Sequence, residues 1–203
     1  MTCRLRYRSP VGVLSLEAEA QGMSGLSFLD RGPPRPGMSG QARAHLDLAV
    51  EALETYFAGR PPRLPPLALR GTPFQLAVWA ALCAIPWGEV RSYGEVARLL
   101  GRAGCARAVG GANHENPVAI LVPCHRVVQA GGKLGGYAAG LDAKRWLLAH
   151  EAGARPRAAP GMRAGPSRAR APARTLPCAG PAAVRSIEGP PRHQESRWRS
   201  SSR

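Results

Sequence analysis

The sequence has no apolar run close to the roughly 20 residues that a membrane-spanning helix needs. Its first residues also lack the long apolar core of a secretory signal. Aromatic residues make up only 5% of the 203 positions. The cysteines contain no CxxC pair, which argues against a disulfide framework and against a zinc cluster. They are Cys3, Cys83, Cys105, Cys124 and Cys178. We therefore expect a cytoplasmic protein with no membrane partner and no bound metal.

Acidic residues are scarce as well. Thirteen Asp and Glu stand against 28 Lys and Arg, which gives a formal net charge of +15. Such an excess points to a polyanionic partner, nucleic acid first and an anionic membrane surface second. The charge is unevenly spread, because residues 152–203 hold eleven arginines and two glutamates among mostly Ala, Pro, Gly and Ser. A segment of this kind has little apolar surface to offset its ordering entropy, so we expect disorder over 154–203.

The first part of the chain has the pattern of a small mixed domain. Polar and apolar residues alternate over 4–30, which predicts strands joined by tight turns. Residues 30–40 are rich in Pro and Gly and predict a loop. Apolar residues recur at helical spacing over 41–58, and Gly59 supplies a stop. Residues 59–71 follow as an extended linker.

Two capping boxes mark helix starts in the second part. Thr72 is the expected N-cap, with Pro73 as the first helical residue and Gln75 as the return partner. Residues 92–95 form the second box and open a short helix, and a third helical stretch is expected over about 105–115. Two short helices joined by a tight turn fit a DNA-binding helix-turn-helix, and they also fit an ordinary helical hairpin.

A glycine-rich stretch over 131–140 precedes the last helix, which Asp142 is expected to cap and which ends before Gly153. These signals divide the chain into a small mixed α/β domain over 1–66 and a mainly helical domain over 67–153, followed by the tail. The linker between the two domains holds the boundary.

Cys124 is the strongest candidate for chemistry. It follows an apolar run at 118–122 that predicts a buried strand, and His125 comes next, which suggests a thiol activated by a nearby imidazole. Adjacent side chains on a strand point to opposite faces, so His125 can act through a water. Glu151, at the end of the last helix, can orient the imidazole. A small buried cysteine beside a hydrogen-bonded histidine fits the same residues.

The run RAVGGANHENPVAILVPCHRV closely resembles the active-site region of the O6-alkylguanine-DNA alkyltransferases, the methylated-DNA–protein-cysteine methyltransferases. Further segments resemble the family's substrate loop and final helix, the first helix of its DNA-binding unit, the start of its conserved domain, and the small N-terminal domain of bacterial members. They are GGYAAGLDAKRWLLAHE, VRSYGEVARLLG, TPFQLAVWAALCAIPWGEV and SPVGVLSL. The resemblance covers about residues 4–152. It implies a ribonuclease-H-like N-terminal domain and a winged-helix-like second domain.

The resemblance also implies roles in the reaction. Cys124 matches the acceptor that takes the alkyl group irreversibly, His125 the base that reaches it through a water, and Glu151 the acid that orients the histidine. Asn116 matches the asparagine that braces the active-site turn. Tyr93 matches the tyrosine that protonates guanine as it leaves, which makes guanine a better leaving group.

Other matches concern binding of the damaged base. Arg107 matches the arginine that enters the base stack when the nucleotide flips out. The backbone carbonyls of Val127 and Cys124 match the acceptors of the guanine amino group. Tyr137 matches an apolar wall of the pocket, and the amide of Ala138 would bond the guanine oxygen.

Two departures from the family pattern concern the pocket and a metal. Ala139 stands where members commonly carry a second glycine, so a positive φ there would alter the pocket. The structural zinc site of some members has no counterpart, because Cys3 lacks clustered partners.

The resemblance implies direct-reversal DNA repair. Methyl or other alkyl groups would pass from O6-alkylguanine, and from O4-methylthymine, in double-stranded DNA to Cys124, once per molecule and without a cofactor. It implies a monomer with no obligate protein partner. Two alternatives remain: a non-catalytic binder of damaged DNA, against which Cys124 argues, and a thiol hydrolase that would turn over through Cys124 and His125.

Overall fold

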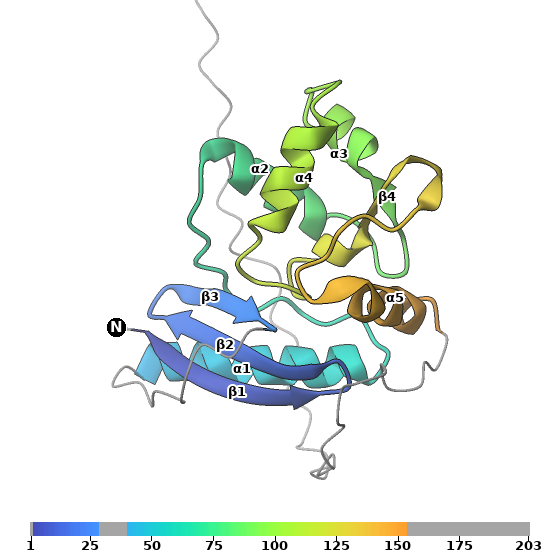
Figure 1. Ribbon diagram of the computed structural model, residues 1–203. Coiled ribbons are helices and arrows are strands. Elements are labelled where there is room, and N and C mark those ends of the chain that lie inside the picture. Colours follow the sequence, from blue (N-terminus) through green and yellow to red (C-terminus); the bar gives the residue numbers. More distant parts are fainter. Residues whose placement is uncertain (1, 29–39, 154–203) are drawn as a thin grey trace, which may run out of the picture. The chain divides into compact units, whose positions relative to one another are not determined.

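The structure is a computed structural model that describes residues 2–28 and 40–153 (Figure 1). The predicted tail over 154–203, with Cys178, lies outside the described residues, as do residue 29 and residues 30–39 of the predicted loop. In the part of the chain that is described, the elements are a three-stranded sheet, five α-helices and a short pair of parallel strands.

An antiparallel sheet opens the chain, as the alternating pattern predicts. Its strands are β1 (Cys3–Ser9), β2 (Gly12–Glu19) and β3 (Gly22–Ser27), in the order β1-β2-β3. Gly22 is required at the start of β3. Its φ is +146°, and a Cβ there would lie 2.5 Å from the carbonyl oxygen of Pro66. The linker therefore runs directly along β3, and the amide of Met23 donates to that same oxygen at 2.8 Å.

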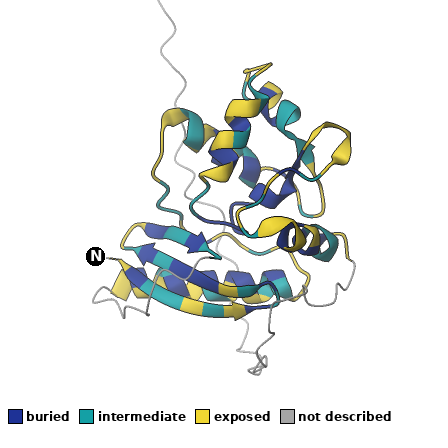
Figure 2. Ribbon diagram, in the orientation of Figure 1, coloured by how far each residue is buried: buried dark blue, intermediate teal, exposed yellow. Residues whose placement is uncertain are grey.

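Helix α1 (Gly40–Phe57) packs on this sheet (Figure 1). Its buried residues are spaced three or four apart, so that they form one face of the helix (Figure 2). They include Leu46, Leu53 and Tyr56. The helix ends just before Gly59, which has a φ of +79°. The helix predicted over 41–58 is confirmed.

The predicted helix starts of the second part are also confirmed. Helix α2 (Pro73–Cys83) has Thr72 as N-cap with a complete capping box, and α3 (Tyr93–Leu99) has the second box. Helix α4 (Ala106–His114) follows after a short turn. The two strands β4 (Arg91–Ser92) and β5 (Val127–Val128) pair in parallel. Helices α3 and α4 pack against each other and α4 packs on α2.

The predicted strand over 118–122 is wrong. Val118 makes a single bridge to Leu26, and the residues after it form a turn in which Ile120 has a φ of +69°. Cys124 then starts a 3-10 turn (Cys124–Arg126). The run is apolar because it is buried, and an apolar run alone does not distinguish a strand from a buried turn.

The last helix, α5 (Gly140–Glu151), begins earlier than predicted. Ala139 holds the N-cap position, and Asp142 lies within the first turn, where it pairs with Arg145. Gly140, the first residue of the helix, has a φ of +84°, and the N-cap forms no side-chain hydrogen bond. Among the described helices, none is both long and apolar enough to cross a membrane.

Candidate active site around Cys124

Cys124 lies on the wall of a cavity of about 320 Å³ and is 5% exposed. Helices α3 and α4, the turn before Cys124 and the loop before α5 form the walls. Four further residues that the sequence singled out line this cavity with Cys124, although they come from three separate segments. They are Tyr93, Asn116, Tyr137 and Ala138.

Asn116 holds the turn that carries Cys124. Its Nδ2 donates to the carbonyl oxygen of Val122 at 2.8 Å, and its Oδ1 accepts from the amide of Val118 at 3.1 Å. One side chain thus satisfies two backbone groups that a strand would have paired with a neighbour. Burial raises the pKa of the Cys124 thiol, and hydrogen bonding by Asn116 and the charge of Lys144 oppose that rise. The thiol is therefore protonated at neutral pH and needs a base.

His125 and Glu151 form a buried pair beside it. The distance from His125 Nε2 to Glu151 Oε1 is 2.6 Å, and both side chains are almost completely buried. Burial lowers the pKa of His125 despite the opposing effect of Glu151, so the imidazole is neutral. Because Nε2 faces a carboxylate oxygen, it must carry the proton. Nδ1, which is buried and has no partner within the described residues, keeps its lone pair.

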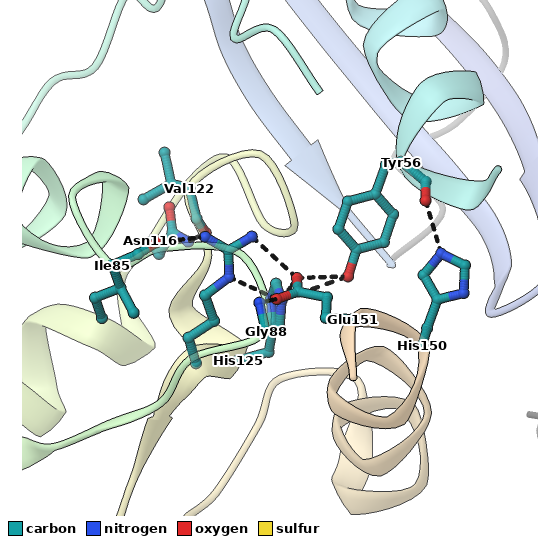
Figure 3. A network of polar contacts seen from close by, with 9 residues as sticks. Tyr56, Ile85, Gly88, Asn116, Val122, His125, His150 and Glu151 are labelled. Atoms are coloured by element: carbon teal, nitrogen blue, oxygen red, sulfur yellow. Dashed lines mark hydrogen bonds and ion pairs between the residues drawn. The ribbon is translucent and has the colours of Figure 1, made fainter. Parts of the chain in front are cut away.

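The Glu151 carboxylate accepts five hydrogen bonds, which fix it in place (Figure 3). Arg126 donates from Nε at 2.7 Å and from Nη2 at 3.1 Å, the Gly88 amide donates at 3.2 Å, and the Tyr56 hydroxyl donates at 3.0 Å. Burial acts to raise the pKa of Glu151, but His125 and Arg126 outweigh it and lower this pKa to about 2. Glu151 is ionised at neutral pH.

Tyr56 and Arg126 were missed as site residues in the sequence. Tyr56 reaches Glu151 from α1, across 95 positions of the chain, and also lies 3.4 Å from His125 Nε2 (Figure 3). Its helical spacing predicted only a core position. The third Arg126 contact, from Nη1 to the carbonyl oxygen of Ile85 at 2.6 Å, shows that this arginine is bonded inside the protein. Its place directly after His125 was the available signal.

The loop before α5 carries Tyr137 and packs against Tyr93 of α3, and both tyrosines line the cavity. A Cβ on Gly135 would lie 2.8 Å from the Tyr93 hydroxyl, so the glycine leaves room for that side chain. Tyr137 is more than an apolar wall, because its buried hydroxyl faces the Cys124 sulfur and opposes the rise in the pKa of that thiol. Its ring meets that of His125 edge-on, with the centroids 6.5 Å apart. Ala139 has a φ of −92°, so the missing glycine causes no backbone strain there.

The two carbonyls expected to receive a guanine amino group already accept hydrogen bonds. The Val127 oxygen accepts from Lys144 Nζ at 2.6 Å, and the Cys124 oxygen accepts from Asn113 Nδ2 at 3.4 Å. Lys144, which the sequence did not single out, is completely buried. Arg107 is exposed on α4 and lies outside the cavity lining. Among the described residues, no group of three His, Cys, Asp or Glu side chains could hold a metal ion.

The chain is similar to proteins of one family. Residues 73–153 match the model described as 6-O-methylguanine DNA methyltransferase, DNA binding domain. A methylated-DNA–protein-cysteine methyltransferase of Mycolicibacterium paratuberculosis is 49% identical over 153 residues, which is 72% of this chain and 92% of the relative. The chain belongs to the methylated-DNA–protein-cysteine methyltransferase family.

Solved structures of this methyltransferase family agree with the fold. The crystal structure of Mycobacterium tuberculosis OGT in complex with DNA has a TM-score of 0.65 and 44% identity, covering 73% of this chain and 91% of that one. The structure of M. tuberculosis O6-methylguanine methyltransferase has a TM-score of 0.65 and 43% identity, covering 77% and 96%. The matched methyltransferase domain contains Cys124, His125 and Glu151, whereas Tyr56 precedes it.

Proposed function

We propose that this methyltransferase-family protein repairs DNA by moving the alkyl group of O6-alkylguanine to the sulfur of Cys124. The supporting observation is the buried His125–Glu151 pair beside Cys124, with Nε2 held by the carboxylate and Nδ1 left as a base. The thioether that forms has no leaving group of comparable quality, so each molecule reacts once. The sequence similarity to named methyltransferases supports the same reaction.

The reaction balances with the groups in place. The thiol proton passes through a water to His125 Nδ1, and Glu151 stabilises the imidazolium through its contact with Nε2. The sulfur attacks the alkyl carbon, the carbon–oxygen bond breaks, and its electron pair goes to the guanine oxygen. Tyr93, on the cavity wall, donates the proton that leaves guanine neutral. Burial raises the pKa of Tyr93, which keeps its hydroxyl protonated until it is needed.

Binding of DNA is assigned to α3 and α4 in the same proposal. Arg107 is exposed on α4 and free to enter the base stack after the damaged nucleotide flips into the cavity. The Ala138 amide would bond the guanine oxygen, and Tyr137 would close the pocket. The similarity to a relative solved in complex with DNA supports binding of DNA. O4-methylthymine in double-stranded DNA is the second substrate.

The proposal also includes the fold of each domain, the cellular location and the oligomeric state. The N-terminal sheet and α1 correspond to a ribonuclease-H-like domain over 1–66, and α2 to α5 to a winged-helix-like domain over 67–153. The protein would act in the cytoplasm as a monomer without a cofactor. The resemblance of the sequence to the family supports these assignments.

The proposal is tested by locating the alkyl group after reaction. The full chain is incubated with a duplex that contains one O6-methylguanine, and the protease-digested protein is analysed by mass spectrometry. We expect one added methylene on the Cys124 peptide, none in Cys124→Ala, and normal transfer in Cys83→Ala, a half-buried cysteine outside the cavity. Damage binding without methyl gain, or methyl gain at another cysteine, would contradict the proposal.

A further inference from the structure

Asn113 is a buried residue of the cavity whose side-chain amide forms a hydrogen bond through its nitrogen but not through its oxygen. It lies near the end of α4, is 6% exposed and lines the cavity beside Cys124. Its Nδ2 donates to the Cys124 carbonyl oxygen at 3.4 Å, whereas its Oδ1 is buried and has no partner in the described residues. Turning the amide over would set two oxygens against each other, so the oxygen must be the free end.

A buried acceptor without a donor is unfavourable unless a ligand supplies one. In the described lining of the cavity, Asn113 Oδ1 is a buried side-chain oxygen without a partner, whereas the Tyr137 hydroxyl faces the Cys124 sulfur. Of these two, only Oδ1 is purely an acceptor. The site therefore has a place for a ligand N–H group at Asn113.

The 2-amino group of guanine matches this position. It carries two N–H bonds, and the Cys124 carbonyl expected to accept one of them is bonded to the Nδ2 of the same Asn113 amide. Asn113 Oδ1 belongs to the same amide group and is therefore the side-chain acceptor next to that carbonyl. The other expected acceptor, the Val127 carbonyl, is already bonded to Lys144 Nζ at 2.6 Å.

We propose that Asn113 determines base specificity, its Oδ1 accepting a hydrogen bond from the 2-amino group of the flipped O6-alkylguanine. The inference rests on the proposed function. It implies a preference for guanine lesions, because the 2-position of thymine carries a carbonyl oxygen that would face Oδ1 as a second acceptor. A site built for a donor discriminates against analogues that lack it.

The test compares two lesions that differ by the amino group alone. Single-turnover rates of transfer are measured with duplexes that contain O6-methylguanine or O6-methylhypoxanthine, which lacks the 2-amino group. The variant is Asn113→Leu, which keeps the approximate shape of the side chain, and Gln41→Leu, an exposed amide on α1, is the matched control. We expect wild type and control to favour O6-methylguanine by about 10-fold, equivalent to one strong hydrogen bond.

In Asn113→Leu, this ratio should fall close to one, because the guanine rate drops while the hypoxanthine rate changes little. Loss of the Nδ2 bond frees the Cys124 carbonyl to accept from a 2-amino group. That change would raise the preference for guanine, so a fall in the ratio reports the loss of Oδ1. Equal slowing of both lesions would overturn the role of Asn113 while leaving the proposed function intact. Wild-type protein alone also tests the idea, since equal rates on the two lesions would overturn it. Absence of any transfer by wild type would instead overturn the proposed function.

Discussion

The two halves of the described chain bury different kinds of side chain. The N-terminal half, β1 to α1, has an apolar interior in which the buried polar side chains are Ser9 and Ser15, without a charged one among its described residues. The C-terminal half, α2 to α5, buries Arg126, Lys144 and Glu151, together with His125 and Asn113. Buried charges are costly unless paired and hydrogen-bonded. Here they are gathered around Cys124, where each is hydrogen-bonded inside the protein.

The N-terminal half still supports the site through backbone and side-chain contacts. Leu26 of β3 exchanges two backbone hydrogen bonds with the turn before Cys124, to the Pro117 oxygen at 2.8 Å and from the Ala119 amide at 2.9 Å. Tyr56 of α1 adds its hydroxyl to the Glu151 carboxylate. The N-terminal half, which we call the scaffold, therefore contacts the site through few residues. The buried charges of the C-terminal half instead depend on one another for their hydrogen bonds.

The largest effect should come from breaking the buried network with Glu151→Gln. The change leaves the Arg126 guanidinium buried without a counter-charge, so the free energy of unfolding should fall by about 3–5 kcal/mol. Alkyl transfer should slow by at least about 100-fold, because the imidazolium of His125 loses its partner. Denaturant unfolding and single-turnover kinetics measure these changes. Glu89→Gln, at an exposed pair with Arg91, should change stability by less than about 0.5 kcal/mol; equal effects of the two substitutions would contradict the prediction.

A substitution in the scaffold should lower the stability without changing the rate of alkyl transfer. Leu53 is completely buried on α1, so Leu53→Ala should lower the free energy of unfolding by about 3 kcal/mol. The transfer rate per folded molecule should stay within about two-fold of wild type, since no contact at Glu151 is lost. Leu48→Ala, at a position that is 45% exposed, is the control. A large loss of transfer rate in folded Leu53→Ala would contradict the prediction that the N-terminal half contributes to stability and not to the reaction.

Lowering the pH should weaken the same buried network in the wild-type protein, because it protonates Glu151. The pKa of Glu151 is about 2 in the folded chain, against about 4.3 in an unfolded one. Its contribution, about 3 kcal/mol, is present above pH 4.3 and is lost as pH falls toward 2. Unfolding free energies measured from about pH 6 downward should therefore decline more steeply in wild type than in Glu151→Gln. Parallel curves would mean that Glu151 is not held ionised.

The smallest effect should come from Tyr56, a side chain of the N-terminal half that contacts Glu151. Tyr56→Phe removes one of five donors to Glu151 and leaves Arg126 in place, so stability should fall by about 1 kcal/mol and transfer by less than about 10-fold. Tyr7→Phe, which removes a hydroxyl from β1, is the matched control. A loss of more than about 100-fold would place the N-terminal half within the chemistry itself.

Local signals in the sequence predicted the local structure. The capping boxes at Thr72 and Ser92 act within four residues, and both helices start where those boxes predict. The run over 118–122 misled because its conformation is set by Asn116, whose side chain satisfies the turn backbone. Asp142 misled because the helix begins at Gly140, which leaves Asp142 within the first turn.

The composition of the site could be predicted only in part. His125 and Glu151 were paired correctly, since the helix that ends at Glu151 packs beside the Cys124 turn. The contacts of Tyr56 and Lys144 join different segments of the chain, so no regular spacing of residues in the sequence indicates them. Folding buries both side chains at the site, where the Tyr56 hydroxyl donates to Glu151 and the Lys144 ammonium donates to the Val127 carbonyl.

The central claim is that Cys124 receives the alkyl group and that the protein then stops. It is tested most directly by counting product with a large excess of O6-methylguanine duplex over the full chain. The account predicts one guanine restored per chain in a single burst, with no further product after prolonged incubation. Continued turnover beyond one equivalent, as a thiol hydrolase would show, or no restored guanine at all, would contradict it.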